Sequence, residues 1–184
     1  IAHKVQKVIV PKYGLLSTPA TSHLIRKENA IGGIILSASH NPGGIDGDFG
    51  VKLNISNGGP APEIITNKIF KASQLLTSYK ICKIQLPDFS EYGTYPYDET
   101  TLEIIDGLTD YSNLMEKIFD FDQISDFLKK DFSLIFDAMN AVTGPYAKNI
   151  FVEKMGLAPD CVMNGNPLKD FGGLHPDPNL TYAS

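Results

Sequence analysis

A serine and a histidine stand side by side where an apolar stretch of the chain ends. The run Ile34–Leu36 is apolar and rich in β-branched residues, and Ser39 and His40 follow it closely. Most of the seven residues after His40, 41–47, are Asn, Pro, Gly or Asp, which end regular structure. We therefore expect the Ser39 hydroxyl at the end of a buried strand, on a loop whose backbone amides can face a ligand. Open α/β sheets place their chemistry in such positions.

A phosphoryl group on Ser39 would suit this setting. It would add about −1.5 to −2 charge at neutral pH and three acceptor oxygens. The glycine-rich loop offers backbone N–H donors, and His40 and Lys52 offer side-chain donors. A phosphoserine can pass its group to a sugar hydroxyl and recover one from the other end of the sugar phosphate, which is the cycle of a mutase.

Ser39 and Lys52 also have interpretations without chemistry. Ser39 can be a turn-forming residue without chemistry, and Lys52 can be a solvated residue of a strand. Serine hydrolysis is the third possibility for Ser39. It is disfavoured because the sequence lacks a Gly-x-Ser-x-Gly elbow and because adjacent residues rarely serve as nucleophile and base.

Composition excludes several classes of protein. The 184 residues have a net charge of −5, which disfavours a nucleic-acid partner because phosphate backbones bind basic surfaces. No apolar run approaches the ~20 residues of a membrane-spanning helix. Cys82 and Cys161 are too few and too far apart for a disulfide framework or a metal knuckle. We expect a reducing, cytoplasmic location and two cysteines that are buried or half-buried.

Hydrophobic periodicity predicts an α/β protein. Apolar or alternating runs predict strands at 4–10, 34–37, 51–55, 102–105, 133–136 and 161–163. Helical spacing and start signals predict helices at 18–29, 62–76, 109–119, 123–130 and 144–155, the first with Thr18 as its N-cap and Pro19 as its first residue. The stretch 88–101 is rich in Tyr, Pro, Asp and Glu without a period, and we expect a surface loop there.

Several motifs resemble those of the α-D-phosphohexomutases, and their glucose branch in particular. Ser37-Ala38-Ser39-His40-Asn41-Pro42 is similar to the phosphoserine loop of that family, Thr-Ala-Ser-His-Asn-Pro, with Ser37 in place of the threonine. Further similar segments follow in family order and cover nearly the whole chain apart from 80–101. They are Gly14–Ala20, Gly47–Asn54, Asn57–Glu63, Asp137–Met139, Val142–Tyr146, Asp170–Gly173 and Asp177–Ala183.

The resemblance implies a fold and a set of site residues. The fold would consist of mixed sheets flanked by helices, as parts of two successive phosphohexomutase domains, with 1–107 the C-terminal part of the phosphoserine-loop domain and 108–184 the N-terminal part of the metal-loop domain. Ser39 would carry the phosphoryl group, and one phosphate oxygen would ligate Mg²⁺. His40 and Lys52 would join Ser39 in catalysis and substrate binding, with Lys52 in acid/base work or contacting the transferring phosphoryl group.

The activity implied is that of a phosphoglucomutase, which interconverts glucose 1-phosphate and glucose 6-phosphate through glucose 1,6-bisphosphate. One alternative is a non-catalytic relative of the parafusin or aciculin type that acts as a regulatory or interaction protein. Another is a phosphomannomutase, which the extended match to the glucose branch disfavours. The resemblance and the composition leave the oligomeric state open.

Two family motifs do not occur in this sequence: the metal loop Asp-Gly-Asp-Gly-Asp-Arg and the sugar-recognition motif Gly-Glu-x-Ser-x-Gly. We therefore expect the sequence to be a segment of a longer protein. By itself, such a segment would bind Mg²⁺ poorly and show essentially no mutase activity.

Overall fold

The computed structural model describes residues 2–39, 41, 45–130 and 132–173. Taken over these residues, the chain forms two compact units whose segments interleave. The first is built from 1–16, 21–33 and 53–107, and the second from 17–20, 34–52 and the chain after 107. Each unit combines helices with short strands, which confirms the predicted α/β class with mixed sheets flanked by helices. The predicted domain boundary after residue 107 remains a prediction.

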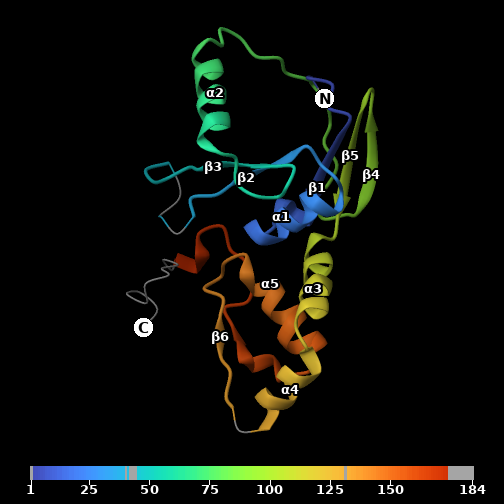
Figure 1. Ribbon diagram of the computed structural model, residues 1–184, viewed down its shortest axis with the longest axis vertical. Coiled ribbons are helices and arrows are strands. Elements are labelled where there is room, and N and C mark those ends of the chain that lie inside the picture. Colours follow the sequence, from blue (N-terminus) through green and yellow to red (C-terminus); the bar gives the residue numbers. More distant parts are fainter. Residues whose placement is uncertain (1, 40, 42–44, 131, 174–184) are drawn as a thin grey trace. The chain divides into compact units, whose positions relative to one another are not determined.

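A three-stranded sheet organises the first unit. Strand β5 (Thr100–Ile105) lies between β1 (Lys7–Pro11), to which it is parallel, and β4 (Gly93–Tyr97), to which it is antiparallel (Figure 1). Every second residue of β5 is buried, because side chains alternate between the two faces of a strand. Leu102 and Ile104 therefore supply core to this unit. The predicted first strand begins three residues later than expected, since Lys4 has a left-handed backbone with φ of 56°.

Strand β4 contradicts the prediction of a surface loop at 88–101. Within that stretch, Gly93–Tyr97 pairs with β5 along its whole length, and Tyr95 lies opposite Leu102. Pro96 obscured the strand in the sequence. It is tolerated because β4 is the last strand of the sheet, where a missing N–H breaks no ladder on the open side.

Strands β2 (Gly32–Leu36) and β3 (Val51–Ile55) form a sheet of their own. The Gly32 Cα faces the Asn54 carbonyl, whereas Ser37, just after β2, donates its N–H to the Gly50 carbonyl just before β3 at 2.9 Å. The partner positions thus run in opposite directions, so the two strands are antiparallel. Both strands match their predicted positions closely.

Helix α1 (Thr18–Lys27) begins at the predicted motif, but its cap is a different residue. The Ala20 N–H donates to Ser17 Oγ at 3.3 Å, so Ser17 is the N-cap and Thr18 is the first helical residue. The prediction of Thr18 as N-cap was therefore wrong by one position. The helix ends before Asn29, whose φ of 49° is left-handed, as is common just beyond a helix.

Helix α2 (Glu63–Gln74) lies within the predicted range 62–76. It contains no buried residue, and side chains such as Ile64 and Phe70 are mostly exposed. Its apolar face thus has no cover among the described residues. Figure 1 shows α2 followed by a long irregular segment that leads to β4.

The second unit contains helices α3 (Gly107–Ile118), α4 (Phe121–Lys130) and α5 (Thr143–Ala147), and the parallel pair β6 (Phe136–Asp137) and β7 (Val162–Met163). The predicted strand at 133–136 is thus reduced to its last residue and the one that follows it. The predicted helix at 144–155 is α-helical only in α5 and continues as a π-helix, Lys148–Lys154, which ends before Gly156 with φ of 66°. Short 3-10 turns occur at Lys12–Gly14, Pro159–Cys161 and Phe171–Gly173.

The core of the second unit is formed by side chains of α3, α4 and the helical segment that consists of α5 and the π-helix. Tyr146 is buried and meets the Tyr111 ring edge-on, with centroids 5.6 Å apart. The buried Ser125 hydroxyl donates to the Met155 carbonyl at 2.7 Å, which satisfies one of the orphan carbonyls at the end of the π-helix.

The two cysteines differ in environment. Cys161 is buried, as predicted, whereas Cys82 is exposed, so the prediction for Cys82 was wrong. Cys82 lies in the irregular segment between α2 and β4, where the chain buries few side chains. Within the part of the chain that the structure describes, no helix has both the length and the apolar character needed to cross a membrane.

The sheet of the first unit predicts how two isoleucine truncations will differ. Ile104→Ala removes a side chain that is only 2% exposed and should lower the free energy of unfolding by about 2–5 kcal/mol. Ile69→Ala removes the same atoms from α2, where the side chain is 50% exposed, and should change it by less than about 1 kcal/mol. Urea unfolding of the protein that contains this sequence measures both. Equal losses would contradict the assignment of the core to β5.

Candidate functional site

Ser39 lies in a turn just beyond the end of β2. The strand ends at Leu36, so the hydroxyl is carried by the turn rather than by the strand itself. Ser39 is exposed and has a φ of 61°, in the left-handed region. A non-glycine residue held there stores on the order of 1–3 kcal/mol of strain, so neighbouring groups must stabilise it.

Two hydrogen bonds hold the turn. Ser37 Oγ accepts the Ser39 N–H at 2.9 Å, and the Ala38 carbonyl accepts the Asn41 N–H at 3.2 Å. The first is a local side-chain-to-backbone bond of the kind that serine forms in turns. Together they fix the backbone on both sides of Ser39.

A close backbone contact anchors this turn to the neighbouring strand. Ser37 donates its N–H to the Gly50 carbonyl at 2.9 Å. A Cβ atom at Gly50 would overlap the Ser37 carbonyl oxygen, so only glycine fits there without a shift of the backbone. The end of β2 is therefore fixed against the start of β3.

Lys52 is placed by the same contact. It is the second residue of β3 and is exposed. Because side chains alternate along a strand, Lys52 projects on the same side as position 50, which lies against Ser37. The structure thus brings the strand of Lys52 to the base of the Ser39 turn. His40, the third predicted site residue, lies outside the described residues.

The far side of the loop is closed by a polar pair that sequence analysis missed. Asn41 Nδ2 donates to Asp48 Oδ2 at 2.6 Å. This bond links Asp48 to the residue two positions after Ser39. For the bond between Ser37 and Ser39 the sequence does carry a signal: a serine two residues before Ser39 has the spacing of a serine turn.

The described residues offer no group of three or more His, Cys, Asp or Glu side chains arranged to hold a metal ion. A divalent ion bound through Ser39 would therefore need ligands from beyond them, since Mg²⁺ prefers six oxygen ligands.

Motif residues of the second unit contact one another. Asp137 Oδ1 accepts hydrogen bonds from the Met139 N–H and from Asn164 Nδ2, both at 2.9 Å. Asn140 Nδ2 donates to the Phe171 carbonyl at 3.2 Å. The segments around 137, 164 and 171 thus form one connected set of loops beyond β6 and β7.

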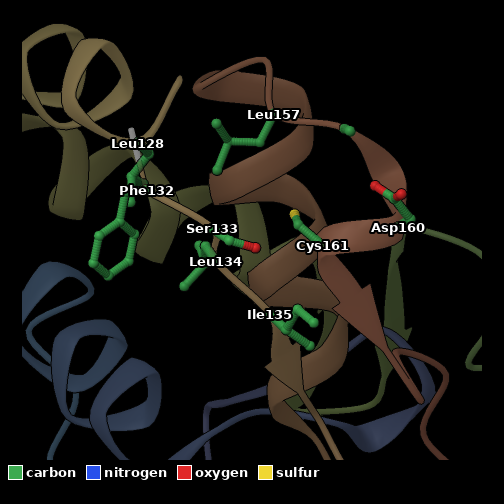
Figure 2. Close-up of a pocket in the computed structure, with 9 residues that line it drawn as sticks. Leu128, Phe132, Ser133, Leu134, Ile135, Leu157, Asp160 and Cys161 are labelled. Atoms are coloured by element: carbon green, nitrogen blue, oxygen red, sulfur yellow. The ribbon is translucent and has the colours of Figure 1, made fainter. Parts of the chain in front are cut away.

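A hollow of about 300 Å³ lies in the second unit (Figure 2). It is lined mainly by apolar side chains from the end of α4, the segment before β6 and the 3-10 turn before β7: Leu128, Phe132, Ser133, Leu134, Ile135, Leu157, Ala158, Asp160 and Cys161. None of these lining residues is a lysine, arginine or histidine that could bind a phosphate group. The hollow is therefore a poor candidate for a sugar phosphate site.

A solved structure has the same fold. The chain superposes on the exocytosis-sensitive phosphoprotein pp63/parafusin (phosphoglucomutase) of Paramecium, in its open form, with a TM-score of 0.90 and 43% identity. The match covers 97% of this chain and 34% of that one. The fold and the serine-bearing turn thus define an α/β protein of the phosphohexomutase class.

Sequence comparison specifies the family further. Residues 1–80 match the model of the phosphoglucomutase/phosphomannomutase α/β/α domain I. The chain is 53% identical to a phosphoglucomutase of Emericella nidulans, over 99% of its own length and 33% of the relative's. It is 52% identical to phosphoglucomutase 2 of Saccharomyces cerevisiae, over 34% of that protein. The chain belongs to the phosphoglucomutase/phosphomannomutase family, and it spans about a third of the length of these relatives.

The environment of Cys161 predicts its reactivity. Burial, with a contribution from the nearby Asp160 carboxylate, raises the pKa of the Cys161 thiol above its ordinary value. The reactive thiolate is therefore scarce near pH 8, and alkylation of Cys161 should be at least about tenfold slower than that of the exposed Cys82. Peptide mass mapping after timed iodoacetamide treatment measures both rates. Equal rates at pH 8 would contradict the burial of Cys161.

Proposed function

We propose that this chain is part of a phosphoglucomutase that interconverts glucose 1-phosphate and glucose 6-phosphate through a phosphoserine at Ser39. The observation that carries the proposal is the exposed Ser39 in a turn fixed to the strand that bears Lys52. In phosphoryl transfer the protein contributes mainly position and electrostatic stabilisation, and this arrangement supplies a positioned hydroxyl with a cation on the adjacent strand. Identity above 50% to several phosphoglucomutases supports the glucose branch.

The proposed cycle has two half-reactions. In the first, the bond between phosphorus and Ser39 Oγ breaks while phosphorus bonds to the free hydroxyl oxygen of glucose 1-phosphate, giving glucose 1,6-bisphosphate. The proton of that hydroxyl ends on Ser39 Oγ, and an acid/base side chain relays it. We propose Lys52 for this role, together with His40, which is adjacent to Ser39 in the sequence. In the second, the bisphosphate turns around, and the bond between phosphorus and its C1 oxygen breaks while phosphorus bonds to Ser39 Oγ. The proton of the Ser39 hydroxyl passes to the C1 oxygen, which releases glucose 6-phosphate. Free glucose 1,6-bisphosphate would therefore act as activator.

We further propose Mg²⁺ as the cofactor, with one oxygen of the Ser39 phosphate among its ligands. The chemistry it would supply is charge neutralisation of the phosphoryl group. Because the described residues contain no metal-ligating cluster, we propose that the remaining ligands come from other parts of the protein and that the 184-residue chain alone is inactive. We also propose the division into successive domains at 1–107 and 108–184 and a cytoplasmic location.

A second candidate rests on the similarity to pp63/parafusin, described both as an exocytosis-sensitive phosphoprotein and as a phosphoglucomutase. This chain could be part of a regulatory or interaction protein in which Ser39 has no catalytic role. The fixed turn and Lys52 favour the enzyme, since a binding surface has no need of both. A coupled assay of glucose 6-phosphate formation with the full-length protein separates the two.

Removing the Ser39 hydroxyl should abolish the reaction. In the full-length protein, Ser39→Ala should lower kcat at least about 10³-fold, since it removes the oxygen proposed to carry the phosphoryl group. Intact mass should also show the loss of one phosphoryl group. The control is Ser56→Ala, which removes an exposed serine just after β3 and should leave both readouts unchanged. High residual turnover of the Ser39 variant would refute the phosphoserine mechanism.

Substitution of Lys52 separates its two proposed roles. Lys52→Ala should lower kcat by about 10²–10⁴-fold, the range for a missing acid/base group. Lys52→Arg keeps the positive charge but not the proton transfer, so recovery of activity by arginine would assign Lys52 to contact with the phosphoryl group. Lys68→Ala removes an exposed lysine of α2 and serves as the control. Full activity of Lys52→Ala in steady-state assays would rule out both roles.

A further inference from the structure

Ser37 links the Ser39 turn to the neighbouring strand through its backbone and its side chain. Its N–H donates to the Gly50 carbonyl at 2.9 Å, and its own carbonyl lies against the Cα of Gly50. Its hydroxyl oxygen accepts the Ser39 N–H at 2.9 Å. One residue thus holds the turn on one side and the sheet on the other.

The hydroxyl contact acts on the conformation of Ser39. A serine with φ of 61° is in a region that L-residues occupy rarely, and the bond to Ser37 Oγ compensates for this by engaging the Ser39 amide. Without an acceptor at position 37, the amide would be satisfied by water and the turn could relax toward more common backbone angles. The Ser39 hydroxyl would then move relative to Lys52.

We propose that Ser37 is a positioning residue for phosphoryl transfer at Ser39, acting through the hydrogen bond from the Ser39 amide to its Oγ. The proposal rests on the proposed function. It requires an oxygen acceptor at position 37 and not serine in particular, so threonine should serve there. The bond is local to the backbone of the turn, so it is available whether Ser39 carries a phosphoryl group or a free hydroxyl.

The matched pair Ser37→Thr and Ser37→Val tests this in the full-length protein. Both side chains are β-branched and of similar shape, but only threonine has an acceptor. We expect Ser37→Val to lower kcat by about 10–100-fold with KM changed less than about threefold, because misplacement of a reacting group by about 1 Å can reduce the rate about 10²-fold. Ser37→Thr should stay within about threefold of the unaltered protein. Ser37→Ala should behave like the valine variant.

Three readouts separate positioning from simple stability. Thermal unfolding reports on stability, steady-state kinetics on kcat and KM, and intact mass on the phosphoryl occupancy of Ser39. If valine and threonine have equal kcat, or if kcat falls only in proportion to the folded fraction, the positioning role is overturned. If the alanine variant does not fold, the threonine and valine pair still decides. If valine does not fold either while threonine does, Ser37 is a structural residue and the proposal fails.

Parallel assay of Ser39→Ala distinguishes this failure from failure of the proposed function. An active Ser39→Ala protein would refute the phosphoserine mechanism, and the positioning role with it. An inactive Ser39→Ala protein together with a fully active Ser37→Val protein would overturn the positioning role alone.

Discussion

The close approach of Ser37 to Gly50 is the contact on which the candidate site depends. It joins the first residue after β2 to the last residue before β3 through backbone atoms, and no side chain can be added at Gly50 without displacing them. Ser39 lies two residues after Ser37 in the turn, and Lys52 lies two residues after Gly50 on β3. The relative placement of the two groups is thus set by the sheet and not by the flexible side chains of the loop.

Most of the elements could be predicted from periodicity, and the exceptions have physical causes. Helices α1 and α2 and strands β2, β3 and β5 carry clear apolar patterns over their lengths. Strand β4 could not be predicted, because Gly93–Tyr97 includes a proline and becomes a strand only through pairing with β5. The π-helix after α5 has no local signal, since the residues of Lys148–Lys154 are compatible with an ordinary α-helix.

The candidate site was predictable in its residue types but not in its connections. The motif around Ser39 and the strand of Lys52 follow from the sequence. The bond from the Ser39 amide to Ser37 Oγ depends on the left-handed backbone of Ser39, which no sequence pattern specifies for a serine. The pairing of Asn41 with Asp48 joins two residues that are seven positions apart, and no local pattern in the sequence specifies it.

The commitment of the Ser39 amide to Ser37 bears on the energetics of the proposed exchange. A phosphoryl group on Ser39 is not solvated by that amide as long as the bond to Ser37 persists. As far as this one amide is concerned, the phosphoryl group is held less firmly than an anion that such an N–H group binds directly. A reversible exchange requires donor and acceptor of similar free energy, because a transfer that is steeply downhill one way is slow on return. Under the proposed mechanism, an amide committed to Ser37 would favour release of the phosphoryl group as well as its acceptance.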